Sequence, residues 1–269
     1  ENKNILWITT DYGINRFNIA TKKFQPYYLG YKDKETFREH SFLATRNSEG
    51  LILAASYKSG IYKFNTKSED FEPFPIPEID KNNIIQLFFD SSDNLWIVND
   101  KNEIFRLKIK SDKITEKQKI TPPADFLHLC YDKKEKIWFQ YENYTLGYYS
   151  IQTEKFSDWG SKPYGELNEV LENEGNILFA TNTGLIQYNK HTKTESILLS
   201  GIPVLSVYSG TQDILWVGTD SQGIYRILPP QNYFNTFTSN NIPELGNYAV
   251  RAIYKDAENK LWIGTKGGG

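Results

Sequence analysis

The sequence predicts an all-β fold built from repeated four-stranded units. The first observation is a five-residue apolar pattern, of which LWIGT is one copy, that occurs seven times with steps of 38 to 46 residues. The second is that turn-forming residues and further short apolar runs surround each copy in the same order. The third is composition, because 15% of the residues are aromatic and aromatic rings suit the pleated surfaces of strands. No segment shows the apolar period of a helix.

Each pentapeptide predicts the second strand of a unit. Before it lies a turn rich in Asp, Asn and Gly, and before that turn an apolar first strand, such as IIQLFF at 84–89. After it comes a third strand that often opens with glycine, such as GIYKFN at 60–65, and then a fourth, such as FEPF at 71–74. The copies are LWITT at 6–10, LILAA at 51–55, LWIVN at 95–99, IWFQY at 137–141, ILFAT at 177–181, LWVGT at 215–219 and LWIGT at 261–265.

Four strands in each repeat of about 40–45 residues are typical of a β-propeller blade. A single blade has two apolar faces, and stacking blades around an axis buries each face against a neighbour. We therefore expect the residue at the second pentapeptide position to lie between blades, where a fully buried ring contributes about 3 kcal/mol or more. These residues are Trp7, Trp96, Trp138, Leu178, Trp216 and Trp262.

The phase of the repeats predicts one β-propeller domain or fragment over residues 1–269. We expect five complete blades and partial blades at 1–28 and 247–269. The partial blades cannot merge, because each supplies a second strand. We therefore expect a longer array, seven-bladed in the intact domain, that is truncated in mid-blade. The chain begins at Glu1 and contains no methionine, so we expect a mature or excised piece.

Charge and cysteine content exclude several classes of function. The formal net charge of -2 gives no overall electrostatic case for binding nucleic acid or an anionic membrane. The single cysteine, Cys130, excludes an internal disulfide and a zinc site built from cysteines, and its apolar neighbours predict a small buried side chain. No apolar run approaches the roughly 20 residues that a membrane-spanning helix needs.

The repeat as a whole resembles that of the regulator propellers in the periplasmic sensor region of Bacteroidetes hybrid two-component systems. The resemblance rests on an acidic turn followed by LW-[IV]-G-T and by a glycine that opens the next strand. It covers nearly the whole chain and is strongest at Leu215–Ile227, Leu6–Asn18 and Leu261–Gly267. The copies at 95 and 137 depart from it, because they lack the Gly-Thr pair and the glycine before the third strand.

The resemblance implies a non-catalytic, ligand-sensing domain of a sensor histidine kinase and response regulator. It implies a carbohydrate ligand, control of polysaccharide-utilisation genes and a periplasmic location in an inner-membrane protein. The implied partners are a glycan-derived oligosaccharide or monosaccharide, the remaining propeller and β-sandwich of the same parent protein, and a second copy in a homodimer. Nucleic acid is not expected.

Candidate ligand-binding residues lie in the loops between second and third strands and in the connections between blades. Variable loops on a constant scaffold carry binding residues, and Tyr, Trp, Asn, Asp, Lys and Arg suit a carbohydrate. Solvated loops without a role in binding remain the alternative for each of them. The candidates are Tyr12, Arg38, Tyr57, Lys58, Asp100, Tyr141, Asn143, Tyr144, Trp159 and Asp220.

The sequence offers little for catalysis. The three histidines are scattered, no metal-ligand spacing occurs, and DSSDN at 90–94 is a turn that lacks the glycine and distal glutamate of a calcium loop. We expect no catalytic residue, metal or cofactor. Two alternatives stay open, namely a propeller enzyme of the lyase or glycoside hydrolase type and a propeller used for protein interaction.

Overall fold

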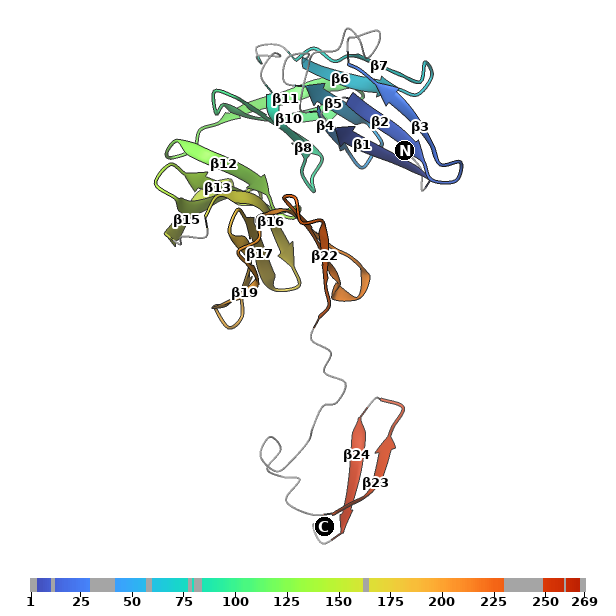
Figure 1. Cartoon of the computed structure of the whole chain (residues 1–269), viewed down its shortest axis with the longest axis vertical. Helices are drawn as coiled ribbons and strands as arrows, with labels where there is room; N and C mark the ends of the chain where they lie inside the picture. The colour runs from blue at the N-terminus through green and yellow to red at the C-terminus, as the bar shows by residue number, and fades with distance from the viewer. Residues whose placement is uncertain are drawn as a thin grey trace. The chain divides into compact units, whose positions relative to one another are not determined.

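The computed structural model describes residues 4–10, 13–29, 42–56, 60–76, 79, 84–161, 165–229, 249–258 and 260–266. The chain divides into two compact units. Unit 1 comprises residues 1–211 and 215–227, and unit 2 comprises residues 212–214 and 228–269. Among the described residues the regular structure is all strand except for one 3-10 turn, η1 (Thr211–Asp213) (Figure 1). No helix in this part of the chain is long and apolar enough to cross a membrane.

The described residues of unit 1 form six antiparallel sheets, numbered sheet 1 to sheet 6 in chain order. Within each sheet, the strands that are neighbours in sequence pair with each other. Sheets 1 and 2 contain the strands β1 (Ile5–Thr10), β2 (Gly13–Asn18) and β3 (Lys23–Tyr27), and β4 (Phe42–Arg46), β5 (Ile52–Ser56), β6 (Gly60–Asn65) and β7 (Asp70–Pro73), respectively. Sheets 3 and 4 contain β8 (Ile84–Phe89), β9 (Asn94–Asn99), β10 (Ile104–Lys110) and β11 (Lys113–Ile120), and β12 (Phe126–Tyr131), β13 (Lys136–Tyr141), β14 (Thr145–Ser150) and β15 (Lys155–Ser161), respectively. Sheets 5 and 6 contain β16 (Leu167–Asn173), β17 (Asn176–Thr181), β18 (Gly184–Asn189) and β19 (Thr194–Ser200), and β20 (Val204–Ser209), β21 (Leu215–Thr219) and β22 (Ile224–Ile227), respectively.

Unit 2 contains one antiparallel hairpin, formed by β23 (Ala249–Lys255) and β24 (Leu261–Lys266). These strands coincide with the first and second strands that the sequence predicts for the last partial blade. Tyr254 lies opposite Trp262, and Lys255 lies opposite Leu261.

The predicted all-β propeller of four-stranded blades is confirmed. Sheets 2 to 5 each show four strands, and the third strands predicted at 60–65 and 184–189 coincide with β6 and β18. In sheet 6 the fourth strand predicted at 234–237 lies outside the described residues. The division into five complete and two partial blades, and the seven-bladed intact domain, therefore stay predictions.

Successive sheets of unit 1 pack face to face, so the core is a series of layers between sheets. First strands lie beside first strands, because β4 contacts β8, β12 contacts β16 and β16 contacts β20. Trp96 lies in the layer between sheets 3 and 4, and Trp138 in the layer between sheets 4 and 5. Trp96, Trp138 and Leu178 are at most 1% exposed. Trp7 is half-buried against Phe64 and Phe71 of sheet 2.

Two of the six predicted interlayer residues are exposed. Trp216 of β21 is 44% exposed, and Trp262 of β24 is 61% exposed. Trp216 shares its face of sheet 6 with Tyr208 and Ile224, which are 65% and 74% exposed. Within each unit, no described strand covers the face that carries the tryptophan. The expectation of burial therefore holds only where a neighbouring sheet of the same unit supplies the opposing surface.

An aspartate at the start of the first hairpin of a blade joins the turn to the interlayer tryptophan. Oδ1 of Asp132 accepts hydrogen bonds from the backbone N–H groups of Lys134, Glu135 and Lys136, each at 3.0 Å, and Oδ2 accepts one from Trp138 Nε1 at 3.4 Å. Because an indole N–H buried in an apolar layer needs an acceptor, one carboxylate satisfies both the turn and the ring.

The same arrangement recurs in sheet 3 and in unit 2. Asp90 accepts from Trp96 Nε1 at 2.8 Å, and Asp256 accepts from Trp262 Nε1 at 2.8 Å. The hydrogen bond from Trp262, followed by the one from the Lys260 backbone, lowers the pKa of Asp256. The DSSDN segment at 90–94 is thus a turn closed by its own aspartate, as the sequence predicts.

Sheet 5 replaces this pair with Glu172 and Leu178. Without an indole to bind, the carboxylate of Glu172, 8% exposed, lies 2.5 Å from Lys190 Nζ, 3.4 Å from Lys136 Nζ and 3.7 Å from Lys134 Nζ. Burial by itself would raise the pKa of Glu172, but the hydrogen bond from Lys190 and the surrounding ammonium charges lower it below its ordinary value.

Cys130 is the small buried side chain that the sequence predicts. It is 7% exposed in the layer between sheets 4 and 5. Burial, and then the nearby charge of Glu169, raises the pKa of its thiol to about 12.

Removing the carboxylate of Asp132 should destabilise the fold. Asp132→Ala should lower the free energy of unfolding by about 2–3 kcal/mol, because it removes hydrogen bonds to a charged group and leaves Trp138 Nε1 buried without its acceptor. Urea denaturation measures the change. Glu135→Ala in the same turn removes only an exposed pair with Lys136 and serves as the control. Equal effects of the two substitutions would contradict the role of Asp132.

Glu172 should make stability depend on pH. A glutamate whose pKa is lowered in the folded state stabilises that state above its unfolded pKa of about 4.3, and the contribution is lost as the pH falls through the folded pKa. Between pH 6 and pH 3, wild-type protein should therefore lose more stability than Glu172→Gln. Urea denaturation at several pH values tests this, with Glu174→Gln in the adjacent exposed turn as the control. Parallel profiles for wild type and Glu172→Gln would refute it.

The raised thiol pKa predicts that Cys130 is unreactive in the folded protein, because the thiolate is the nucleophile. At pH 8, a disulfide reagent such as Ellman's reagent should label Cys130 in urea but not in native buffer. Rapid labelling without denaturant would show that the thiol is accessible.

Candidate ligand-binding site

The chain path brings two kinds of loop to one edge of the sheets. Since each sheet is an antiparallel meander, the loop between its second and third strands and the connection to the next sheet lie at the same end of the strands. This end is called the loop edge below. The loops predicted to carry ligand contacts are all on it.

A polar crevice of about 390 Å³ opens at the loop edge of sheet 3. One wall is the β9–β10 loop, and the other is the connection from β11 to β12. Polar side chains, two prolines and one phenylalanine line it. These residues are Lys101, Asn102, Glu103, Lys119, Ile120, Thr121, Pro122, Pro123, Ala124, Asp125 and Phe126.

Asn99 holds the first wall in place. Its Oδ1 accepts hydrogen bonds from the backbone N–H groups of Lys101 and Glu103, both at 3.0 Å, and its Nδ2 donates to Glu103 Oε2 at 2.8 Å. Asn102, with φ of 59°, donates from Nδ2 to the backbone oxygen of Phe126 at 3.0 Å. The two walls are thereby joined at the base of the crevice. A polar asparagine tolerates the left-handed conformation better than most residues.

Charge within the crevice is paired but accessible. Lys119 Nζ lies 2.7 Å from Glu103 Oε1, and the two side chains are 54% and 34% exposed. The hydrogen bond from Lys119, and then that from Asn99, lowers the pKa of Glu103. The crevice therefore presents a carboxylate, an ammonium and an amide beside the hydroxyl of Thr121. Such a set can both donate to and accept from a neutral polyhydroxylated ligand.

The β13–β14 loop, residues 142–144, lies beside this crevice. The backbone N–H of Glu142 donates to the backbone oxygen of Asp125 at 3.3 Å. Asn143 Oδ1 accepts from the N–H and the hydroxyl of Thr145, at 3.0 and 2.7 Å, and so closes the turn. Tyr144 has φ of 62° and a side chain that is 50% exposed. Its ring is thus available at the loop edge.

The other predicted site residues are more dispersed. Asp100 is exposed at the tip of the β9–β10 loop, next to the crevice. Tyr141 is half-buried and stacks with Phe139, with ring centroids 6.2 Å apart, and burial raises its pKa. Trp159 lies within β15 and not, as expected, in a connection between blades. It is half-buried among Trp138, Tyr148, Phe179 and Tyr188 between sheets 4 and 5.

Asp220 is exposed in the loop after β21, where its N–H donates to the Pro203 backbone oxygen at 3.0 Å. Tyr12, Arg38, Tyr57 and Lys58 lie outside the described residues. Ligand contact by any of the ten candidates stays a prediction.

The crevice also contains polar residues that the sequence analysis did not select. Asn102, Glu103, Lys119, Thr121 and Asp125 belong to it. The available signal was Pro122-Pro123 followed by Asp125, since two prolines end strand pairing and turn the chain outward.

Among the described residues, no group of three or more His, Cys, Asp or Glu side chains is placed to hold a metal ion. His128 lies in the first strand of sheet 4, and His191 in the β18–β19 turn at the opposite edge of sheet 5.

Comparison with known families gives a match at one repeat. The model described as "Two component regulator propeller" matches residues 244–267. One repeat of this chain, residues 244–267, is thus similar to the two-component regulator propeller. The resemblance predicted from the repeats is thereby confirmed. A comparison with curated proteins gives no match.

Solved structures show the same propeller fold. The extracellular domain of a hybrid two component system from B. thetaiotaomicron matches with a TM-score of 0.64 and 22% identity, over 100% of this chain and 38% of that one. A second such domain from the same organism has a TM-score of 0.57 and 18% identity, over 89% and 32%. This chain thus spans about a third of their length.

Virginiamycin B lyase from Staphylococcus aureus, in a catalytically inactive form with quinupristin, also matches. Its TM-score is 0.60 and its identity 14%, over 98% of this chain and 89% of that one. At these identities the likeness shows the fold and not the activity.

Tyr144 should tolerate glycine. Because a Cβ disfavours the left-handed conformation by about 1–2 kcal/mol, Tyr144→Gly should keep or raise stability, by up to about 1 kcal/mol. Tyr208→Gly, at an exposed strand position of sheet 6, is the control and should lower it. Thermal unfolding of both variants distinguishes them. A marked loss with Tyr144→Gly would show that the ring packs against the fold.

Proposed function

We propose that this chain is the ligand-sensing part of a periplasmic sensor of the hybrid two-component type. The regulator propeller repeat and the likeness to two extracellular domains of such systems support this proposal. In it, the chain itself is not an enzyme. It binds a ligand, and the remaining propeller, β-sandwich and kinase of the parent protein carry the signal across the inner membrane.

We further propose that the ligand is an oligosaccharide or monosaccharide from polysaccharide breakdown, and that utilisation genes respond to it. The observation that carries this proposal is the chemistry of the polar crevice. Sugar hydroxyls pair with mixed donors and acceptors such as Asn102, Glu103 and Lys119. Pro122 and Pro123 supply apolar surface for C–H faces. A volume of about 390 Å³ suits a small saccharide in an open site.

A lyase-type enzyme is the second candidate. The observation that favours it is the match to virginiamycin B lyase over 89% of that chain. It requires turnover of a ligand, which a sensor does not.

Saccharide binding at the crevice can be tested directly. Calorimetry with oligosaccharides from plant and host glycans should give binding to wild-type protein with no change in the sugar. The double variant Thr121→Ala/Asp125→Ala should weaken that binding at least tenfold, because it removes a hydroxyl and a carboxylate from one wall. Asp112→Ala, at the opposite edge of sheet 3, should bind as wild type does.

The outcomes separate the candidates. Sugar turnover followed by chromatography would favour an enzyme. Equal affinity of wild type and the crevice variant would place the site elsewhere. No binding by any glycan fragment would refute carbohydrate sensing by this chain.

A further inference from the structure

A second crevice lies at the loop edge of sheet 2, in the position that corresponds to the polar crevice of sheet 3. It has a volume of about 220 Å³. It is bounded by the start of β6, the end of β7, the connection from β7 and the start of β8. The lining residues that the structure describes are Gly60, Ile61, Tyr62, Pro73, Phe74, Pro75, Ile76, Ile79 and Ile84.

The prolines explain why the crevice exists. β6 and β7 pair as far as Tyr62 and Pro73, and the last bond is donated by the N–H of Phe74 to the backbone oxygen of Ile61 at 2.8 Å. Pro75 has no N–H and cannot continue the ladder. The chain therefore leaves the edge of β6, and a gap opens between β6 and the start of β8.

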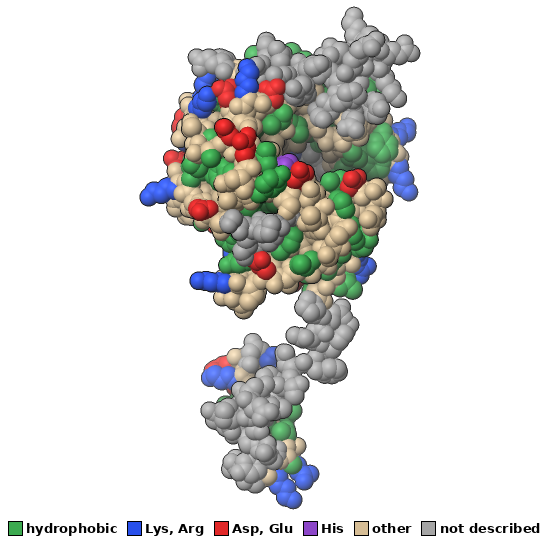
Figure 2. All heavy atoms as spheres, turned by 60° about the vertical axis from the view of Figure 1, so that its left-hand side comes forward, with side chains coloured by type: hydrophobic (Ala, Val, Ile, Leu, Met, Phe, Trp, Pro, Cys, Tyr) green, Lys and Arg blue, Asp and Glu red, His purple; other side chains and the backbone are tan. Residues whose placement is uncertain are grey.

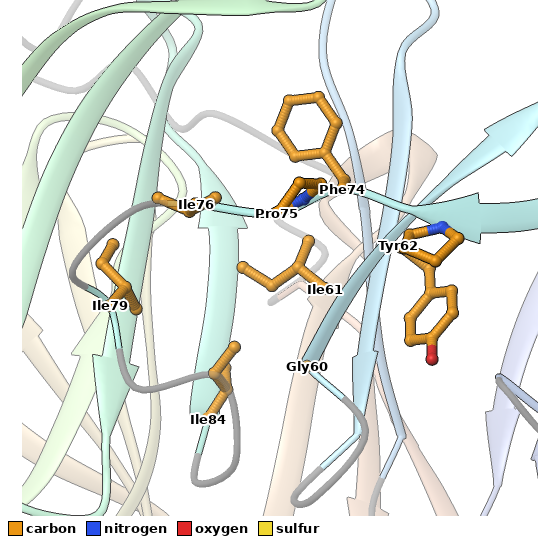
Figure 3. Close-up of a pocket in the computed structure, with 9 residues that line it drawn as sticks. Gly60, Ile61, Tyr62, Phe74, Pro75, Ile76, Ile79 and Ile84 are labelled. Carbon is orange, nitrogen blue, oxygen red and sulfur yellow. The ribbon is translucent and has the colours of Figure 1, made fainter.

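The walls of this gap are apolar. Figure 3 shows that the side chain of Ile61 points toward Ile76, Ile79 and Ile84, whereas the ring of Tyr62 lies on the other side of β6. Ile61, Ile76, Ile79 and Ile84 are 6%, 8%, 6% and 2% exposed. No charged side chain is among the described lining residues. Among the described lining residues only Tyr62 has a polar side chain, and its ring lies on the other side of β6.

The size and chemistry of the gap select its ligand. An apolar cavity of about 150 Å³ lined by Leu, Ile and Phe stays dry and accepts benzene, because water there lacks polar partners. The crevice of sheet 2 is larger and, unlike that cavity, open to solvent, but isoleucine, phenylalanine and proline side chains line it as well. Side chains that face a void lose dispersion contacts, and an apolar ring restores them.

We propose that the sheet 2 crevice is a binding site for a single uncharged aromatic ring, free or carried by a larger molecule. The site is distinct from the polar crevice, and its ligand class differs from a saccharide. Its occupancy is therefore independent of the function proposed above.

Phenol is a suitable probe, with benzene as a second ring and glucose as a polar control. In ligand-observed NMR and calorimetry, wild-type protein should bind phenol and benzene at millimolar concentration, and glucose should not displace them. Ile79→Phe and Ile76→Phe each place a ring in the crevice from the connection, and each should weaken phenol binding at least tenfold. Ile202→Phe, in the corresponding connection between β19 and β20, should bind phenol as wild type does.

Circular dichroism and cooperative unfolding establish that the variants fold. If one of the two filling variants does not fold, the other one still tests the proposal. Phenol binding that survives both filling variants would overturn the proposal, as would no binding of either ring to wild type. Displacement of phenol by glucose would assign the ring to the polar crevice and would also overturn it.

Discussion

Both faces of each blade are apolar, and the rest of the structure depends on covering them. A meander of four short strands cannot bury two faces by itself, so each sheet relies on the next one in the chain. In sheets 3 and 4 the second strand is buried on both sides, with Leu95 and Ile97 facing one layer and Trp96 and Val98 the other. Where no described strand of the same unit supplies the opposing surface, as at Trp216, the same pattern leaves an aromatic side chain exposed.

This packing favours a partner for the indole nitrogen. At Trp96, Trp138 and Trp262, the aspartate six residues earlier accepts a hydrogen bond from the indole N–H while closing the hairpin turn. Sheet 5 shows how closely the two positions are linked. Leu178 has no donor, and the acid at the corresponding position, Glu172, is held by lysines of two sheets instead. The acidic turn of the repeat is thus explained by packing, without a role in binding.

The proposed ligand site lies at the loop edge, where packing between the sheets constrains the side chains less. The two crevices occupy corresponding places in adjacent sheets and differ through their connections. Figure 3 shows the crevice of sheet 2. Figure 2 shows acidic, basic and hydrophobic side chains interspersed on one face of the molecule. Pro73-Phe74-Pro75-Ile76 gives sheet 2 an apolar gap. Thr121-Pro122-Pro123-Ala124-Asp125 gives sheet 3 a polar one. The same scaffold therefore presents different chemistry in each blade through a few residues that follow the fourth strand.

Much of the fold was predictable because its determinants are local and repeated. The strands at 13–18, 60–65 and 184–189, the acidic turns, the burial of Cys130 and the interlayer positions of Trp96 and Trp138 all follow from residues close together in the sequence. For the candidate site, the sequence predicted only the edge of the sheets on which it lies. Asp100 and Tyr144 were selected in the loops beside the crevice, whereas Asn102, Glu103, Lys119 and Asp125 were not.

The sequence by itself determined the repeat, the strand order and the edge that carries the variable loops, because strand period and turn chemistry act over a few residues. Only the tertiary structure decided which side chains line each crevice and which aromatic rings are used in packing. Those choices depend on where a connection leaves its sheet and on which neighbour covers each face. Trp159 is an example: the sequence predicts a ligand-binding residue in a loop, whereas in the structure its ring packs between sheets 4 and 5.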